Sequence, residues 1–143
     1  MKQQKKNLID TMVKTRFSPV EESTFSIYEE YESLLSPDDT DDICTLCFYR
    51  GESYFRIGKF KEAITDLMKC IRENKNPSLL WLNACSYNTL GLIYSFLGNE
   101  FLSMKNYQQC LYISEKQHLY HMITVSYLNI GGLYRDLNDD RKA

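Results

Sequence analysis

The sequence predicts an all-α fold, a right-handed α-solenoid of antiparallel helix pairs. Two observations lead to this prediction: a short motif recurs every 40 residues, and signals for helix starts recur at the same interval. The motif occupies residues 51–58, 91–98 and 131–138. Each copy has a glycine, a tyrosine three residues later, an aliphatic residue three further on, and a turn residue. Repeats of this length are typical of stacked arrays, in which each unit buries its apolar face against its neighbours.

The helix-start signals combine a capping residue with proline. Residues 18–21 read Ser-Pro-Val-Glu, where the serine can cap a helix, the proline has no N–H to leave unpaired, and the glutamate completes a capping box. The same kind of signal stands at Pro37 and at Pro77, which are 40 residues apart. The period therefore governs where helices start as well as where the glycine motif lies.

These signals divide the chain into helices. We expect first helices over residues 37–57, 77–97 and 117–137, and shorter second helices over residues 60–74 and 100–115. Gly58 and Gly98 are placed to end the first helices, since glycine adopts the left-handed backbone conformation without strain. Before them, apolar side chains at three- and four-residue steps over residues 2–17 and again over residues 20–35 predict two further amphipathic helices.

We predict one domain over residues 1–143. Its parts are a degenerate opening helix pair (1–35), a first repeat (37–75), a second repeat (77–116) and an incomplete third repeat (117–143). The register places the small residue of a further second helix at Ala143, where the given sequence stops. We therefore expect a fragment of a longer protein, because helix 117–137 would otherwise expose an apolar stripe.

Glycine inside a helix needs a reason, because it costs about 1 kcal/mol relative to alanine. Gly51, Gly91 and Gly131 share one register position. We predict that each lets the paired second helix approach closely, with Ala63 and Ser103 as the small residues opposite. A tyrosine three residues after each glycine, on the same helix face, is expected to fill the space beyond the contact.

These segments resemble tetratricopeptide repeats. The resemblance is strongest over residues 88–94, 97–99 and 107–111, and it extends from about Pro37 to Ala143. It departs in period, 40 residues instead of about 34, which resembles the longer variants of bacterial regulators. It departs also at Arg50, where the other repeats have Leu90 and Ile130, and at two cysteines where the family usually has alanine.

Composition restricts the environment and the classes of partner. The formal net charge is −2, so no overall field favours nucleic acid. No apolar run is long enough to span a bilayer, and an odd number of cysteines, 5, agrees with a reducing compartment. We therefore expect a cytoplasmic protein that binds neither nucleic acid nor membrane directly.

The sequence predicts no catalytic, cofactor or metal site. Cys44 and Cys47 have the spacing of a zinc or redox pair, but both fall inside an expected helix and no second pair follows, which favours a packed core position. Cys85 is expected nearer the surface. The acidic residues 38–42 lack the glycine and distal glutamate of a calcium loop, and they suit the positive end of a helix. His118 and His121 have no further ligand beside them, which favours a surface role.

The resemblance implies a groove for peptides along the inner faces of the first helices. Two asparagines there are expected to bond a peptide backbone, and two phenylalanines to anchor apolar side chains. A merely solvated surface is the equally weighted alternative. The expected groove residues are Phe48, Tyr49, Glu52, Phe55, Asn88, Thr89, Leu92, Leu128, Asn129 and Arg135. These residues do not form the carboxylate clamp of the chaperone-binding members of the family.

The resemblance therefore implies a non-enzymatic scaffold for a protein or peptide partner. Its expected setting is the N-terminal sensory or docking part of a bacterial signal-transduction protein, such as one with a diguanylate cyclase or kinase output domain. One alternative is a self-assembly element, in which helix 117–137 forms a homo-oligomer. Another is the peptide-sensing part of a transcriptional regulator. An enzyme or metal protein that uses the cysteines is the third class.

Overall fold

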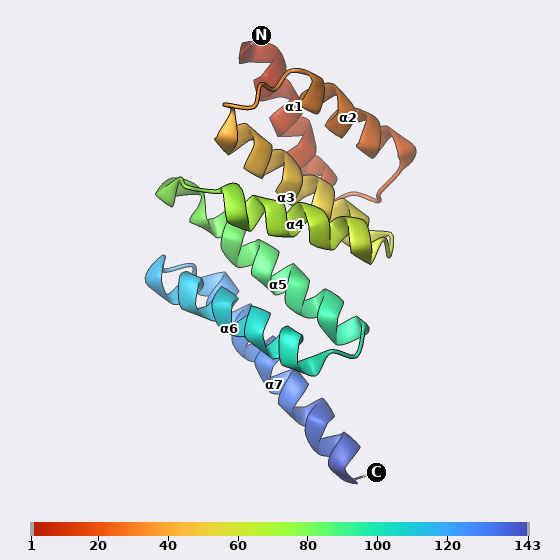
Figure 1. The fold of residues 1–143 in the computed structure, drawn as a ribbon, viewed down its shortest axis with the longest axis vertical. Helices are drawn as coiled ribbons and strands as arrows, with labels where there is room; N and C mark the ends of the chain where they lie inside the picture. The colour runs from red at the N-terminus through yellow and green to blue at the C-terminus, as the bar shows by residue number, and fades with distance from the viewer. Residues whose placement is uncertain (1, 143) are drawn as a thin grey trace. The chain divides into compact units, whose positions relative to one another are not determined.

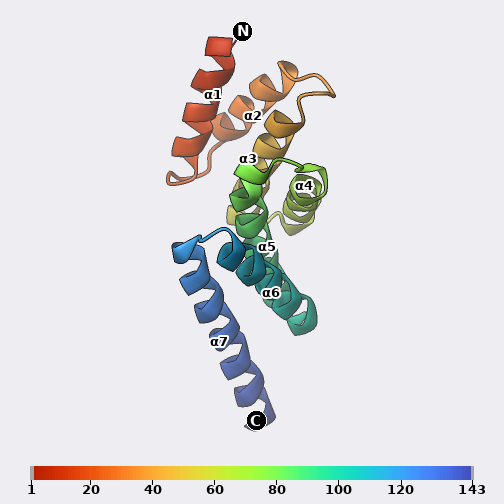
Figure 2. The ribbon, with the colours of Figure 1, turned by 90° about the vertical axis from the view of Figure 1, so that its left-hand side faces the viewer.

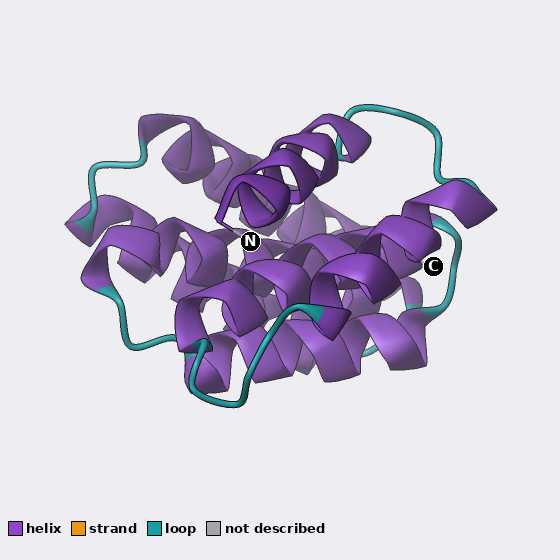
Figure 3. Cartoon of the chain, turned by 90° about the horizontal axis from the view of Figure 1, so that it is seen from above, coloured by secondary structure: helices purple, strands orange, loops and turns teal. Residues whose placement is uncertain are grey.

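The computed structural model describes residues 2–142, and all secondary structure in that range is helical (Figure 3). The α-helices are α1 (Lys2–Thr15), α2 (Glu22–Ser33), α3 (Thr40–Arg56), α4 (Phe60–Glu73), α5 (Leu80–Phe96), α6 (Glu100–Lys116) and α7 (Tyr120–Lys142). A short 3-10 helix, η1 (Pro77–Leu79), precedes α5. The predicted fold class, an all-α arrangement of helix pairs, is confirmed.

The chain forms two compact units, one ending at Asn76 and one starting at Pro77. The first contains α1 to α4, and its main contact is the pairing of α3 with α4 (Figure 1). α1 and α2 cross more openly and touch less than α3 and α4 do (Figure 2). In the second unit α5 pairs with α6, and α7 packs mainly on α6.

Helix starts recur at the predicted interval, but the first helices start three residues later than predicted. The first helices α3 and α5 start at Thr40 and Leu80, and the second helices α4 and α6 at Phe60 and Glu100. The prolines Pro37 and Pro77 open a turn and the 3-10 helix η1, respectively, so each α-helix begins only afterwards. The expected second helices are confirmed to within a residue.

The start of α2 also differs from the prediction. Its cap is Glu21, whose backbone N–H donates to Thr24 Oγ1 at 3.1 Å while its carboxylate accepts from the Thr24 backbone. The expected cap, Ser18, instead donates its hydroxyl to the Lys14 carbonyl at 3.2 Å, at the end of α1. A capping box is therefore present, three residues later than expected.

The helix ends show why glycine was a reliable signal. Gly58 and Gly98 have φ of 78° and 77°, which confirms the left-handed stops. The N–H groups that follow them turn back to Tyr54 O at 2.9 Å and Tyr94 O at 2.8 Å. At the third copy the position is Asn138, which stays helical, so α7 continues to Lys142 and the expected end at residue 137 is wrong. The expected small-residue position Ala143 lies outside the described residues.

The glycines within α3 and α5 are the points of closest helix approach. A Cβ on Gly51 would lie 2.9 Å from Leu67 Cγ and 3.2 Å from Asp66 Cβ, and one on Gly91 would collide with the ring of Tyr107. The predicted close approach is confirmed at these two positions but not at Gly131, where a Cβ would meet nothing within 4 Å. The atoms opposite belong to these bulky side chains and not to the predicted small ones, although Ser103 Oγ donates to the Gly91 carbonyl at 2.8 Å.

Arg50 joins three helices of the first unit. Its Nε and Nη2 donate to the two carboxylate oxygens of Asp66 in α4, both at 2.8 Å, and its Nη1 donates to Glu32 in α2 at 2.6 Å. The bond to Asp66 raises the pKa of the Arg50 guanidinium. Because the Asp66 side chain is 8% exposed, its charge depends on this arginine for compensation.

The cysteines are packed in the interior. Cys44 and Cys47 are both buried, and burial raises the pKa of both thiols, that of Cys47 to about 11. The prediction that this pair belongs to the core is confirmed. The expectation that Cys85 is accessible is wrong, because the stretch of α5 around it, residues 82–86, is buried on all sides.

We predict opposite effects of alanine at two glycines. Gly91→Ala should lower the free energy of unfolding by about 1–3 kcal/mol, because the new methyl group collides with the buried Tyr107 ring. Gly131→Ala should raise it by up to about 1 kcal/mol, since nothing lies within 4 Å of its Cβ position. Urea denaturation of both variants measures the two changes. Equal stability of Gly91→Ala and Gly131→Ala would contradict the prediction and show that the Tyr107 ring moves aside.

We predict that Arg50→Leu lowers the free energy of unfolding by about 3 kcal/mol, because Asp66 is left buried without a partner. The double variant Arg50→Leu/Asp66→Asn, which copies Leu90 and Asn106 of the second unit, should recover at least half of the loss. The control Glu32→Gln should cost less than about 1 kcal/mol, as Glu32 is 58% exposed. A double variant no more stable than Arg50→Leu would contradict this account.

Candidate functional site

The inner face of α3 is covered by the first helical segment of the chain. The Arg16 guanidinium lies 5.1 Å from the ring centroid of Phe48, and its Nη2 lies 3.3 Å from Glu52 Oε1. Arg56 donates to the carbonyl groups of Thr15 and Ser18 and so ties the end of α1 to α3. Phe48 is fully buried, so it presents no surface to an incoming peptide.

The other end of α1 meets the acidic residues before and within α3. Lys5 Nζ lies 3.3 Å from Asp39 Oδ2 and 3.5 Å from Asp42 Oδ2, and the Tyr31 hydroxyl donates to Asp42 at 2.9 Å. The backbone N–H of Ser36, together with Lys5, lowers the pKa of the Asp39 carboxyl. The acidic run is thus engaged by basic and polar side chains. Among the side chains of residues 2–139, no three from His, Cys, Asp or Glu are grouped to hold a metal ion.

The remaining expected groove residues of the first unit are only partly accessible. Tyr49 is 5% exposed, and its carbonyl accepts the Tyr28 hydroxyl at 3.1 Å. Phe55 is half-buried and stacks on Phe60, with ring centroids 6.0 Å apart. Glu52 is half-buried beside Arg16. In this unit the expected peptide face is therefore largely filled by the chain itself.

In the second unit the structure brings two expected groove residues together. Asn129 Nδ2 of α7 donates to Asn88 Oδ1 of α5 at 2.7 Å, and both side chains are half-buried. Leu92 is half-buried, whereas Leu128 is 69% exposed and Arg135 is exposed. Thr89 is the exception, since it is buried and offers no contact surface.

The paired amides leave hydrogen-bonding groups for a ligand. One amide donor and one amide acceptor are used between Asn88 and Asn129, which leaves the amino group of the first and the carbonyl of the second. Among the described residues these two groups have no other side-chain partner. A donor and an acceptor side by side are the complement of one peptide unit of an extended chain.

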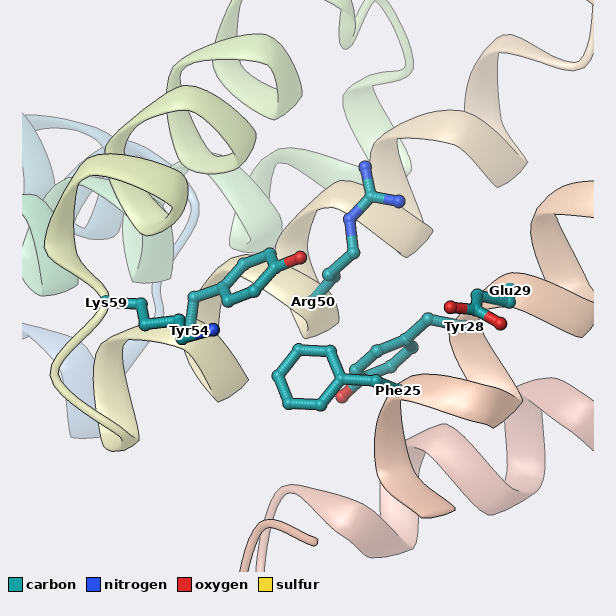
Figure 4. Close-up of a pocket in the computed structure, with 6 residues that line it drawn as sticks. All are labelled: Phe25, Tyr28, Glu29, Arg50, Tyr54 and Lys59. Atoms are coloured by element: carbon teal, nitrogen blue, oxygen red, sulfur yellow. The ribbon is translucent and has the colours of Figure 1, made fainter. Parts of the chain in front are cut away.

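A cavity that was not expected from the sequence lies in the first unit. A cavity of about 300 Å³ is lined by Phe25, Tyr28, Glu29, Arg50, Tyr54 and Lys59 (Figure 4). The Phe25 ring lies 4.9 Å from that of Tyr54 and 5.8 Å from that of Tyr28, so three aromatic rings form one wall. The only sequence signal was Arg50, a charged residue where the other repeats are aliphatic. Phe25 has no place in the repeat pattern.

The geometry defines a class: helical-repeat proteins in which glycines set the pairing of successive helices. Residues 45–77 and 86–117 match a sequence model of the tetratricopeptide repeat family. These two segments include most of the α3–α4 pair and of the α5–α6 pair, and the match confirms the resemblance to tetratricopeptide repeats there. No curated protein and no solved structure matches the chain.

The family match gives the general function. Tetratricopeptide repeats are scaffolds for protein interaction, and the match points to no catalytic family. Across residues 2–142, no helix combines the length and apolar character needed to cross a membrane.

We predict that Glu52 makes the stability of the first unit pH-dependent. Burial raises the pKa of its carboxyl above the ordinary 4.5, and Arg16 only partly opposes this. The folded state then holds more protons than the unfolded state just above pH 4.5, so the free energy of unfolding falls as pH rises through this window. Glu52→Gln removes that loss, and its stability relative to wild type should increase between about pH 4 and about pH 7.

Urea denaturation at both pH values measures this difference, with Glu29→Gln, an exposed carboxylate of the same unit, as the control. A relative stability of Glu52→Gln that decreases toward neutral pH would mean that the ion pair with Arg16 outweighs desolvation, contrary to the prediction.

Proposed function

We propose that the protein binds an extended peptide segment of a partner protein along the inner face of α5 and α7. The observation that carries this proposal is the bond between Asn129 and Asn88, which sets two amides side by side at half-buried positions. Their remaining donor and acceptor would bond one peptide unit of the partner. Asparagine amides bind backbone regardless of the partner's side chains, so specificity must come from their neighbours.

The neighbours of the amide pair suggest the side chains of the partner. Leu128, next to Asn129 in α7, is 69% exposed, and Leu92, one turn after Asn88 in α5, is half-buried. These two side chains offer apolar contacts close to the amide pair. Arg135 is exposed further along α7 and would receive an acidic side chain. A peptide with an apolar residue and a downstream or upstream carboxylate fits this surface best.

The first unit is less suited to this role. Its equivalent residues Phe48 and Tyr49 are buried, and Glu52 is paired with Arg16. A partner that used this face would first have to displace α1 and break its polar contacts. We therefore place the binding site in the second unit.

The setting we propose is a docking module within a bacterial signal-transduction protein of the cytoplasm. The support for this setting is the resemblance to long-period repeats of bacterial regulators, together with five buried cysteines, an odd number that suits a reducing compartment.

Self-assembly through α7 is the second candidate function. The observation that favours it is the open space beside Gly131, where the equivalent glycines of α3 and α5 meet a second helix.

We predict that Asn88→Ala and Asn129→Ala each weaken peptide binding about three- to tenfold, the effect of losing one or two hydrogen bonds. The probe is a set of peptides selected on the wild-type protein from a phage-displayed random library, and dissociation constants follow from fluorescence anisotropy. Gln108→Ala, at an exposed position of α6, is the control and should bind as the wild type does. Dissociation constants unchanged in both asparagine variants would contradict the proposed face.

A further inference from the structure

The cavity of the first unit lies between three consecutive helices. Its lining comes from α2 (Phe25, Tyr28 and Glu29), from α3 (Arg50 and Tyr54) and from the residue before α4 (Lys59). All of its walls therefore belong to one compact unit. Its volume of about 300 Å³ is at the lower end of ligand sites, which range from about 300 to about 1,000 Å³. This size suits a small molecule with a single ring.

The wall of the cavity is aromatic. The Phe25 ring lies 4.9 Å from that of Tyr54 at a tilt of 37°, and it meets the Tyr28 ring edge-on. The Tyr28 hydroxyl is used in the interior, where it donates to the Tyr49 carbonyl at 3.1 Å. Rings this close leave no space for a third ring between them. A ligand ring would instead pack against the side of the wall, in the stacked or edge-to-face contacts that aromatic rings favour.

One cation at the cavity is available to a ligand. The Arg50 guanidinium is already compensated, because it donates to the carboxylates of Asp66 and Glu32. Lys59 is exposed, and its ammonium group forms no ion pair with the described side chains. A free ammonium group beside an aromatic wall can bind a molecule that joins an aromatic ring to a carboxylate.

An unpaired carboxylate lies at the other end. Figure 4 shows Lys59 and Glu29 on opposite sides of the aromatic side chains. Glu29 is exposed and accepts no hydrogen bond from the described side chains. A carboxylate accepts from an O–H or N–H group and repels a second anion. The two ends of the cavity therefore favour opposite ends of a ligand, an anion at Lys59 and a hydrogen-bond donor at Glu29.

We propose that this cavity binds a free aromatic carboxylic acid whose ring carries a hydroxyl or N–H group opposite the carboxylate. The ring packs against Phe25 and Tyr54. The carboxylate accepts a hydrogen bond from Lys59 Nζ, and the group on the far side of the ring donates to Glu29. An internal tyrosine of a protein has such a ring but no carboxylate, so the charge of Lys59 favours a free acid. This small-molecule site goes beyond the proposed peptide binding, which uses the second unit.

4-Hydroxyphenylacetate is the probe, because one ring and one methylene separate its hydroxyl from its carboxylate. A ligand-detected NMR titration of the whole chain should give a dissociation constant between about 0.1 and about 1 mM, since a ligand of about eleven non-hydrogen atoms makes few contacts. Absence of binding at about 10 mM would overturn the proposal.

Two related compounds test the groups on the ligand. N-acetyl-tyrosinamide keeps the ring and the hydroxyl but has no carboxylate, and it should bind at least about tenfold more weakly. Phenylacetate lacks the hydroxyl and should bind about three- to tenfold more weakly. Equal binding of N-acetyl-tyrosinamide would indicate a site for tyrosine side chains and would overturn the assignment of a free acid.

Lys59→Gln tests the cation and should weaken the binding of 4-hydroxyphenylacetate at least about fivefold. Lys61→Gln is the matched control, because it removes the same charge from an exposed position that does not line the cavity. It should change the dissociation constant less than about twofold. Both positions are exposed, so both variants should fold as the wild type does. Equal effects of the two substitutions, or no effect of Lys59→Gln, would overturn the site.

Glu29→Ala tests the orientation of the ligand. The preference of the wild type for 4-hydroxyphenylacetate over phenylacetate should disappear in this variant, because the acceptor of the ring hydroxyl is gone. Glu30→Ala, a change of the next exposed carboxylate of α2, is the control and should keep the preference. A preference retained in Glu29→Ala would overturn the proposed orientation. These outcomes leave the test of peptide binding unaffected, because Asn88 and Asn129 lie in the second unit.

Discussion

The contact between a helical glycine and the helix that crosses it is the constraint on which both units depend. At Gly51 the space next to Cα is taken by Leu67, and at Gly91 by the ring of Tyr107. A methyl group at either position would push the helices apart. The contact therefore fixes which turn of the first helix meets which turn of the second. Asn88, one turn before Gly91 in the same helix, bonds to Asn129 of α7.

Most of the fold could be predicted because glycine and proline act through the backbone. Gly58 and Gly98 end helices by adopting a positive φ, which depends little on distant contacts. The helix starts were predicted three residues early because Pro37 and Pro77 first form a turn and a 3-10 helix. Sequence signals name the residues of a cap but do not say which of several candidate donors and acceptors will pair, as the competition between Ser18 and Glu21 shows.

The candidate site could be predicted only where it follows the repeat. The register placed Asn88 and Asn129 on one face, and the structure joins them at 2.7 Å. The covering of Phe48 by Arg16 could not be foreseen, because α1 has its own sequence and its contacts have no counterpart in the other repeats. The same holds for the cavity beside Phe25. The binding role of the groove residues remains a prediction, since burial and geometry describe a surface but not its ligand.

The three glycines at one register position differ in their surroundings. Gly51 and Gly91 are required by contacts within their own units, so their presence needs no partner. Gly131 has no such contact among the described residues, and alanine there would favour the helix by about 1 kcal/mol. Its neighbours Tyr127 and Tyr134 are exposed although their rings would gain from burial. The same register position is therefore a close contact in two helices and an open one in the third, so the repeat in the sequence does not by itself show which of its glycines a helix contact requires.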